Sequence, residues 1–192
     1  MGRIIVSENV TVDGVVQDPA GVGEFEHGGW VGRIGSQGRE EAAKVALEEA
    51  LGTEAMLLGR RTYEFLAARW PSRSGDFADR MNSKPKYIVS STLQAPSWNN
   101  TTVLKGNALS EASRLKEQLA GDIVVAGSLQ LARALFEHDL VDEVRLMIYP
   151  VVLGVGKRVF EGISDIRPMR LVGTKTVAGD LTLLTYEPVL KN

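Results

Sequence analysis

The sequence predicts an α/β protein with a central, mostly parallel sheet flanked by helices and an antiparallel C-terminal edge. Short apolar runs alternate with helical patterns through most of the chain, and this alternation is typical of a parallel sheet. The run DIVVA at 122–126 is apolar on both faces, as in a strand covered from both sides. The end of the chain instead carries strand-like runs in succession, and Gly179-Asp180 between the last two predicts a hairpin turn.

The individual elements follow from local patterns in chain order. β-Branched residues mark the strands, whereas apolar residues at helical spacing, often with a glycine after the last turn, mark the helices. The glycine-rich stretch 13–29 is typical of a binding loop, and 71–85 is polar and irregular. The expected strands are 3–12, 55–58, 86–90, 103–104, 122–126, 143–150, 169–176 and 180–187, and the expected helices are 39–51, 62–69, 108–120 and 129–137.

The composition is that of a soluble globular protein and predicts one domain over residues 1–192. Charged residues make up 24% and hydrophobic residues 44% of the chain, which excludes a disordered protein. The formal net charge of −2 gives no general attraction to nucleic acid or to an anionic membrane surface. No apolar run spans a bilayer, no signal-peptide pattern is present and there are no cysteines, so we expect a cytoplasmic protein without disulfides.

The stretch EAMLLGRRTYEFL, residues 54–66, indicates a strand, a tight turn at Gly59 and a helix start. Free backbone N–H groups and the positive end of the helix dipole favour an anion at such a start. Arg60 and Arg61 add paired donors that suit a phosphate group. Two interpretations stay open: a nucleotide phosphate binds at this turn, or this is an ordinary turn with solvated arginines.

Two further strand exits share this character. IVVAGSLQLARAL, residues 123–135, again runs from strand through a glycine turn at Gly127 into a helix, with Ser128 as the expected N-cap. Ser90-Ser91-Thr92 is the hydroxyl-rich end of a third strand, although alone it fits strand-end hydrogen bonding better. Because ligands of open α/β sheets collect at the carboxyl ends of the strands, the three exits together predict a nucleotide along one sheet edge.

The remaining candidates each have a structural alternative. Asp13 leaves the first strand at the long loop and is the candidate proton donor or substrate anchor, or else part of an ordinary Asp-Gly turn with Gly14. Trp30 either stacks on a flat ring or fills the core. The run 154–158 (GVGKR) is interpreted as a connection, since no clear helix follows it. No metal site is expected, because His27 and its neighbouring glutamates lie in a loop that does not preorganise ligands.

The ordered set of motifs resembles the dihydrofolate reductase-like family. GRRTYEFL after a strand, DFADRMNSKPKYIVSSTL at 76–93, AGSLQLARAL after another strand and YPVVLGVGKRVFEG at 149–162 carry the likeness. More narrowly, they look like the branch related to the C-terminal reductase domain of bacterial riboflavin biosynthesis, RibD, and the likeness runs from Ile4 to Tyr186. The resemblance implies a single reductase domain that uses NADPH as hydride donor and, as is common in this branch, forms a homodimer.

The resemblance also assigns roles at matching positions. It puts phosphates at the turns 59–62 and 126–130, the adenosine ribose and its 2′-phosphate at 90–92, and the nicotinamide and substrate entrance along 9–16. Asp13 is the catalytic candidate, and Asp13, Gly14 and Trp30 are the substrate-binding candidates. The cofactor-binding candidates are Asn9, Val16, Gly59, Arg60, Arg61, Thr62, Ser90, Ser91, Thr92, Ala126, Gly127, Ser128, Leu129 and Gln130.

The expected function is therefore an NADPH-dependent reductase for a small pterin- or pyrimidine-like heterocycle, similar to 5-amino-6-(5-phosphoribosylamino)uracil reductases. Folate is not the expected substrate, because Ala126-Gly127 stands where dihydrofolate reductases carry a double glycine. The alternative from another class is a non-catalytic NADP(H)-binding protein or sensor. The expected partner is a small molecule, with neither nucleic acid nor a membrane involved.

Overall fold

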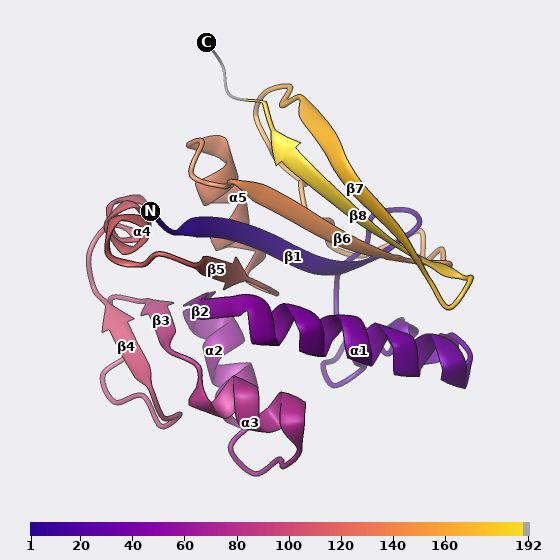
Figure 1. Ribbon diagram of the computed structural model, residues 1–192, viewed down its shortest axis with the longest axis horizontal. Coiled ribbons are helices and arrows are strands. Elements are labelled where there is room, and N and C mark those ends of the chain that lie inside the picture. Colours follow the sequence, from indigo (N-terminus) through magenta and orange to yellow (C-terminus); the bar gives the residue numbers. More distant parts are fainter. Residues whose placement is uncertain (190–192) are drawn as a thin grey trace. The chain divides into compact units, whose positions relative to one another are not determined.

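The computed structural model describes residues 1–189 and contains one mixed sheet of eight strands (Figure 1). Its elements are β1 (Arg3–Thr11), η1 (Trp30–Arg33), α1 (Ser36–Gly52), β2 (Thr53–Gly59), α2 (Arg60–Ala67), α3 (Asp76–Ser83), β3 (Lys86–Val89), β4 (Thr101–Leu104), α4 (Ala108–Gln118), β5 (Asp122–Val125), α5 (Leu129–Glu137), β6 (Glu143–Tyr149), β7 (Met169–Val177) and β8 (Leu181–Pro188). The strand order is β4-β3-β2-β5-β1-β6-β8-β7. The predicted α/β class with an antiparallel C-terminal edge is confirmed, because β1, β2, β3, β4 and β5 pair in parallel whereas β6, β7 and β8 pair antiparallel.

The described chain divides into two compact units, and both β1 and α1 pass through each of them. The first unit contains Met1–Val6 and Ala46–Asp142. The second contains Ser7–Val45 and the described residues from Glu143 onward. The expectation of one domain over the whole chain stays a prediction. No helix within residues 1–189 is long and apolar enough to cross a membrane.

The first unit brings the carboxyl ends of its parallel strands to one edge. Met56 to Gly59 of β2 pair with Lys86 to Val89 of β3, and Ile123 of β5 pairs with Ile4 of β1. One face of these strands is covered by α2 and α3. The buried side chains on that face are Met56, Leu58, Tyr63, Met81, Ile88 and Trp98. The strand exits that carry the predicted phosphate contacts therefore emerge from a packed, rigid support.

The second unit is built on the antiparallel strands β6, β8 and β7. The hairpin between β7 and β8 turns at Ala178 and Gly179, both with positive φ, which confirms the hairpin predicted there. Leu146 of β6 pairs directly with Leu184 of β8. The core of this unit consists of Trp30, Ile34, Met147, Tyr149, Val177 and Leu181.

The main difference from the predicted elements is α3, which lies in the stretch 71–85 that we expected to be irregular. Its eight residues contain only a few apolar side chains, so no long periodic pattern marks it in the sequence. Tertiary contacts stabilise it instead. Ala78 and Met81 are buried, and the side-chain amide of Asn82 donates to the carbonyl of Trp70 and accepts from the indole N–H of Trp98.

Two lysines that follow this helix are buried. Lys84 is 1% exposed and donates to the carbonyl of Ala50 at 2.7 Å. Lys86 is 0% exposed, donates to the carbonyls of Asn82, Lys84 and Asn99, and lies 4.2 Å from the ring centroid of Trp98. Burial lowers the pKa of each lysine to about 8, because the charged form loses its hydration.

The lowered pKa of Lys86 predicts that stability rises with pH above about 8. The unfolded lysine, with its pKa of 10.5, binds more protons than the folded one between these two values, so raising the pH favours the folded state. In urea unfolding at pH 7, 8, 9 and 10, the free energy of unfolding of the wild type minus that of Lys86→Met should increase by up to about 1.4 kcal/mol per pH unit. A difference that stays flat or falls over this range would contradict the burial effect. Lys84 is retained in both proteins, but Lys86 helps to lower the pKa of Lys84, so the difference includes a smaller contribution of the same sign from Lys84.

Candidate functional site

The three predicted strand exits contact one another at the edge of the first unit. The backbone N–H of Gly59 donates to Oγ of Ser128 at 3.0 Å, and Oγ1 of Thr62 donates to the carbonyl of Gly127 at 2.9 Å. Nη1 of Arg60 donates to Oγ1 of Thr92 at 2.6 Å. Residues 59–62, 90–92 and 126–130 thus form one continuous group, which we call the turn cluster. Their contacts confirm that the three exits lie together at one edge of the first unit.

Gly127 allows the two helix-starting turns to approach closely. Its φ of +66° lies in the left-handed region that side chains disfavour. A Cβ atom added here would lie 3.3 Å from Cγ2 of Thr62. A residue with a side chain would therefore strain the backbone and push the turn at 59–62 away. The close approach of the two turns therefore favours glycine at position 127.

Both helices that begin at the turn cluster lack a side-chain cap. Gly59 precedes α2, and no side chain accepts from the first N–H groups of that helix as a cap. Ser128 precedes α5, but its Oγ accepts from Gly59 instead of capping its own helix, so the predicted N-cap role is wrong. The physical reason is that Ser128 is 6% exposed and faces the neighbouring turn. Two helix starts without a side-chain cap favour an anion at this edge.

The two arginines of the turn cluster differ in their hydrogen bonds and ion pairs. Arg60 is held by Nε donation to Glu64 at 2.7 Å and by its contact with Thr92. Arg61 is exposed and makes no hydrogen bond or ion pair with any residue in the range 1–189. The exposed ion pair Arg60–Glu64 contributes little to stability, so a ligand phosphate can replace Glu64 as the partner of Arg60. Both guanidinium groups can therefore bind a ligand phosphate.

The remaining cofactor candidates of the first unit vary in exposure. Ser90 is 9% exposed, and its Oγ accepts from the backbone N–H groups of Thr92 and Leu93, which is the strand-end role that its residue type also predicts. The exposed members are Ser91, Thr92, Gly127 and Gln130, whereas Ala126 and Leu129 are half-buried. The exposed hydroxyls and backbone groups are the ones that can contact a ligand.

Asp13 lies in the second unit and is engaged by several donors. Oδ1 accepts from the hydroxyl of Thr11 at 2.7 Å and from the N–H of Leu153 at 3.2 Å, while Oδ2 accepts from the N–H of Gly154 at 2.7 Å. The hydrogen bond from Thr11 does most to hold the pKa of this carboxyl below its usual value, and both backbone donors act in the same direction. Asp13 is therefore ionised near neutral pH, which suits a hydrogen-bond acceptor and not a proton donor.

The other candidates of the second unit divide between surface and core. Asn9 is exposed on β1, and Gly14 is half-buried with a φ of +84° that the Asp-Gly turn requires. Val16 is 7% exposed and donates its N–H to the carbonyl of Lys157. Asn9 and Gly14 remain accessible to a ligand, whereas the side chain of Val16 is largely buried.

Trp30 is a correction to the predicted substrate-binding set. It is 1% exposed, packs edge-to-face on Tyr149 with ring centroids 5.4 Å apart, and donates its indole N–H to the carbonyl of Gln17 at 2.9 Å. A fully buried indole with its donor satisfied has no face left for a flat ligand. The core alternative therefore describes Trp30.

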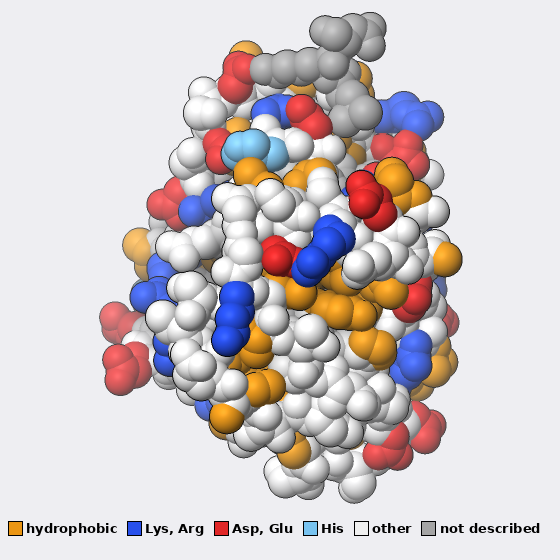
Figure 2. All heavy atoms as spheres, turned by 90° about the vertical axis from the view of Figure 1, so that its left-hand side faces the viewer, with side chains coloured by type: hydrophobic (Ala, Val, Ile, Leu, Met, Phe, Trp, Pro, Cys, Tyr) orange, Lys and Arg blue, Asp and Glu red, His pale blue; other side chains and the backbone are white. Residues whose placement is uncertain are grey.

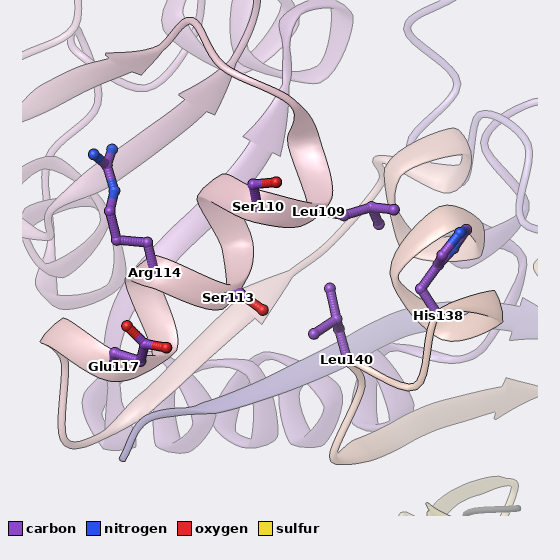
Figure 3. A pocket seen from close by; sticks show the side chains of 7 residues that line it. All are labelled: Leu109, Ser110, Ser113, Arg114, Glu117, His138 and Leu140. Atoms are coloured by element: carbon purple, nitrogen blue, oxygen red, sulfur yellow. The ribbon is translucent and has the colours of Figure 1, made fainter.

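The first unit also has a hollow on its surface. It runs between α4 and the end of α5 and is lined by Leu109, Ser110, Ser113, Arg114, Glu117, His138 and Leu140 (Figure 3). None of the predicted site residues lines it. Because ligands of open α/β sheets bind at the carboxyl ends of the strands, the hydrogen-bonded strand exits are the better candidate site. Among residues 1–189, no three His, Asp or Glu side chains gather as a metal site requires.

Sequence reasoning missed one part of this arrangement, the segment 151–158 that contacts the turn after β1. It is a connection without a helix, as predicted for 154–158, but it supplies the donors that hold Asp13. The sequence feature that could have indicated this contact is the pair Gly154 and Gly156 next to Lys157 and Arg158. Both glycines have positive φ in the structure. Glycine adopts positive φ at little steric cost, so glycines at these two positions suit the loop conformation.

Known structures share this fold. A putative riboflavin biosynthesis protein from Shewanella sp. PV-4 has 19% identity and a TM-score of 0.76, covering 98% of this chain and 99% of its own. A deaminase/5-amino-6-(5-phosphoribosylamino)uracil reductase from Thermotoga maritima has 15% identity and a TM-score of 0.64 over 98% of this chain and 57% of its own. Dihydrofolate reductase from Enterococcus faecalis, complexed with NADP(H), has 12% identity and a TM-score of 0.59 over 97% and 96%. The fold is dihydrofolate reductase-like.

Sequence comparison gives the family. The protein YyaP of Bacillus subtilis, described as uncharacterized, is 29% identical over 138 residues, which are 69% of this chain and 73% of YyaP. The model of the RibD C-terminal domain matches residues 3–183. This match includes every residue of the turn cluster and Asp13, and it agrees with the resemblance seen in the motifs. The chain belongs to the RibD C-terminal domain family.

Proposed function

We propose that this protein is an NADPH-dependent reductase that transfers a hydride to a small heterocyclic compound. The observation that carries the proposal is the turn cluster, in which three strand exits of the first unit are tied by direct hydrogen bonds. The membership in the RibD C-terminal domain family supports it. When bound, NADPH supplies the hydride, and the chain contributes binding and orientation.

The residues of the turn cluster fit the phosphates of such a cofactor. The uncapped starts of α2 and α5 offer backbone N–H groups to the pyrophosphate. Gly127 keeps the edge free of a side chain, so a phosphate reaches these donors. Arg60 with Thr92, together with the free guanidinium of Arg61, would hold the 2′-phosphate through charge-assisted hydrogen bonds.

Of the two proton sources considered for hydride transfer, Asp13 and a water in the loop region, we propose the water. Asp13 is ionised and its oxygens are engaged, so we assign it no proton-donor role. Water at the substrate would supply the proton. The substrate class we propose is a pterin- or pyrimidine-like ring, because the Thermotoga maritima neighbour is described as a reductase of 5-amino-6-(5-phosphoribosylamino)uracil.

Titration of NADPH and NADH, followed by nicotinamide fluorescence, tests the proposal. We expect NADPH to bind with a Kd in the micromolar range or tighter. A Kd of 1 μM corresponds to a binding free energy of about 8 kcal/mol. Binding of neither dinucleotide below about millimolar concentration would contradict the proposal. Oxidation of NADPH with a panel of pterins and pyrimidine precursors then separates a reductase from a non-catalytic sensor, which would bind the cofactor without turnover.

Replacing the arginines of the turn cluster should discriminate between the two dinucleotides. Arg60→Ala or Arg61→Ala should weaken NADPH by about 1–3 kcal/mol more than NADH, since only NADPH carries the 2′-phosphate. Isothermal titration of both ligands measures the difference. Arg69→Ala is the matched control, because this arginine of the same unit stacks on Phe65 and donates to its carbonyl. Equal losses for NADPH and NADH would assign the arginines to the pyrophosphate or to the fold.

Self-association and location are further proposals. We propose a homodimer formed through the sheet face that carries Leu146, Ile148 and Leu184, which are only half-buried in the second unit. Sedimentation velocity of the wild type and Leu146→Lys would show a dimer that the lysine disrupts.

We propose a cytoplasmic protein that binds neither nucleic acid nor membranes. Figure 2 shows basic and acidic side chains interspersed on one face of the molecule.

A further inference from the structure

Two segments far apart in the sequence are joined in the second unit. They are the turn 11–17 after β1 and the segment 151–158 after β6, which we call the loop pair. The N–H of Val12 donates to the carbonyl of Val151 at 3.0 Å, and the N–H of Val16 donates to the carbonyl of Lys157 at 2.9 Å. Val15 and Arg158 form an isolated antiparallel bridge. The loop pair is thus a short hydrogen-bonded ribbon and not two independent loops.

Asp13 and Arg158 hold the loop pair reciprocally. The carboxylate of Asp13 reaches across to accept from the N–H groups of Leu153 and Gly154. The guanidinium of Arg158 reaches back, with Nε donating to the carbonyl of Asp13 at 3.1 Å and Nη2 lying 3.9 Å from Oδ2. Each residue therefore contacts the opposite segment, through backbone groups that an ordinary Asp-Gly turn leaves unused.

The glycines of the loop pair allow its two segments to approach closely. Gly154 and Gly156 have φ values of +76° and +120°, which other residues rarely adopt. A Cβ atom on Gly156 would lie 2.6 Å from Cγ1 of Val15, so the two segments are in direct contact there. The backbone N–H of Lys157 also donates across the loop pair, to Oε1 of Gln17 at 3.1 Å.

We infer that Asp13 and Arg158 are positioning residues that hold 151–158 against the turn after β1, so that both segments present one rigid surface to the ligand. This inference rests on the proposed function for its ligand, because residues 9–16 would face the nicotinamide and the substrate. The charged carboxylate acts through the loop it holds and not by proton transfer. Loss of either residue removes hydrogen bonds from the loop pair and loosens 151–158, while the backbone bonds of Val12 and Val16 remain. The ligand must then order the loosened segment on binding, which costs affinity.

The experiment compares two ligands that differ in the nicotinamide. NADPH and adenosine 2′,5′-bisphosphate share the 2′-phosphate, but only NADPH carries the nicotinamide end. Asp13→Ala, Arg158→Ala and the double variant should each bind NADPH about tenfold more weakly than wild type. Their affinity for adenosine 2′,5′-bisphosphate should stay within about twofold. The double variant should bind NADPH at least as weakly as the weaker single one, since the Asp13 carboxylate and the Arg158 guanidinium hold the loop pair through different backbone groups. Arg158→Lys, which keeps one donor toward Asp13, should restore part of the loss.

Amide hydrogen exchange gives a readout that needs no ligand. The N–H groups of Leu153 and Gly154 should exchange faster in Asp13→Ala and Arg158→Ala, while the strands of the second unit keep their protection. Arg33→Ala is the matched control. This arginine of the same unit is exposed and has no hydrogen-bond or ion-pair partner in the described part of the chain.

Three outcomes would overturn the inference. In the first, exchange at Leu153 and Gly154 is unchanged in both variants. In the second, Asp13→Ala loses NADPH affinity while Arg158→Ala behaves as wild type, which would assign Asp13 a direct ligand contact. In the third, the variants lose both ligands equally. Failure of the wild type to bind either ligand would instead refute the proposed function, and the exchange measurement would still decide whether the loop pair is held as inferred.

Discussion

Replacing Gly127 with valine should weaken NADPH binding by roughly a hundredfold, a loss of about 2.7 kcal/mol. The φ of +66° at this position is unfavourable for a β-branched residue, and the added Cβ would lie 3.3 Å from Cγ2 of Thr62. The valine would displace the turn at 59–62 and cover the backbone donors at the start of α5. Both effects act on the groups that we propose hold the pyrophosphate, so the loss should be similar for NADPH and NADH.

The matched pair Gly127→Ala and Gly75→Ala separates the site from backbone strain. Gly75 also has a positive φ, of 104°, but a Cβ there has no neighbour within 4 Å. Both alanine variants should lose stability in thermal unfolding, by about 1–3 kcal/mol for each strained residue. Only Gly127→Ala should also bind NADPH more weakly. If Gly127→Val unfolds, Gly127→Ala carries the test. Wild-type affinity in both Gly127 variants would show that the cofactor does not approach this turn.

Replacing Trp98 with alanine should destabilise the protein by about 3–5 kcal/mol, the range expected for removing a large buried aromatic side chain. Trp98 is 1% exposed and belongs to the core cluster of the first unit. Its indole N–H donates to Asn82 at 2.7 Å, and its ring lies beneath the amine of Lys86. The alanine variant would leave a cavity, an unpaired amide oxygen and a buried cation without its aromatic partner.

Urea unfolding followed by far-ultraviolet circular dichroism measures this effect. Trp98→Phe should recover most of the lost stability, because it keeps a ring but not the hydrogen bond to Asn82. Trp70→Ala is the control within the same cluster: this indole is only half-buried and packs edge-to-face on Phe77. A loss at Trp98→Ala no greater than that at Trp70→Ala would contradict the central packing role of Trp98.

Local patterns in the sequence predicted most of the fold because they determine periodicity and breaks. The helix 129–137 is observed with the predicted bounds, and the strands differ from the predicted ranges by a few residues at most. The helix α3 was missed, because a short helix with few apolar residues depends on partners such as Trp70 and Trp98 that are distant in sequence. Lys84 and Lys86 were likewise unexpected in the core, since only the folded chain supplies the carbonyls that accept from their amines.

The sequence by itself determined where the strand exits lie and which residue types they offer, because glycines, hydroxyls and arginines at the ends of apolar runs have local meaning. Only the tertiary structure decided which of these groups meet. In the folded chain, Oγ of Ser128 accepts from the N–H of Gly59 and does not cap its own helix. Trp30 is buried in the core. The carboxylate of Asp13 accepts from backbone donors of 151–158. A side chain's role depends on burial and on the distant segments packed against it, and neither is encoded in its neighbours along the chain.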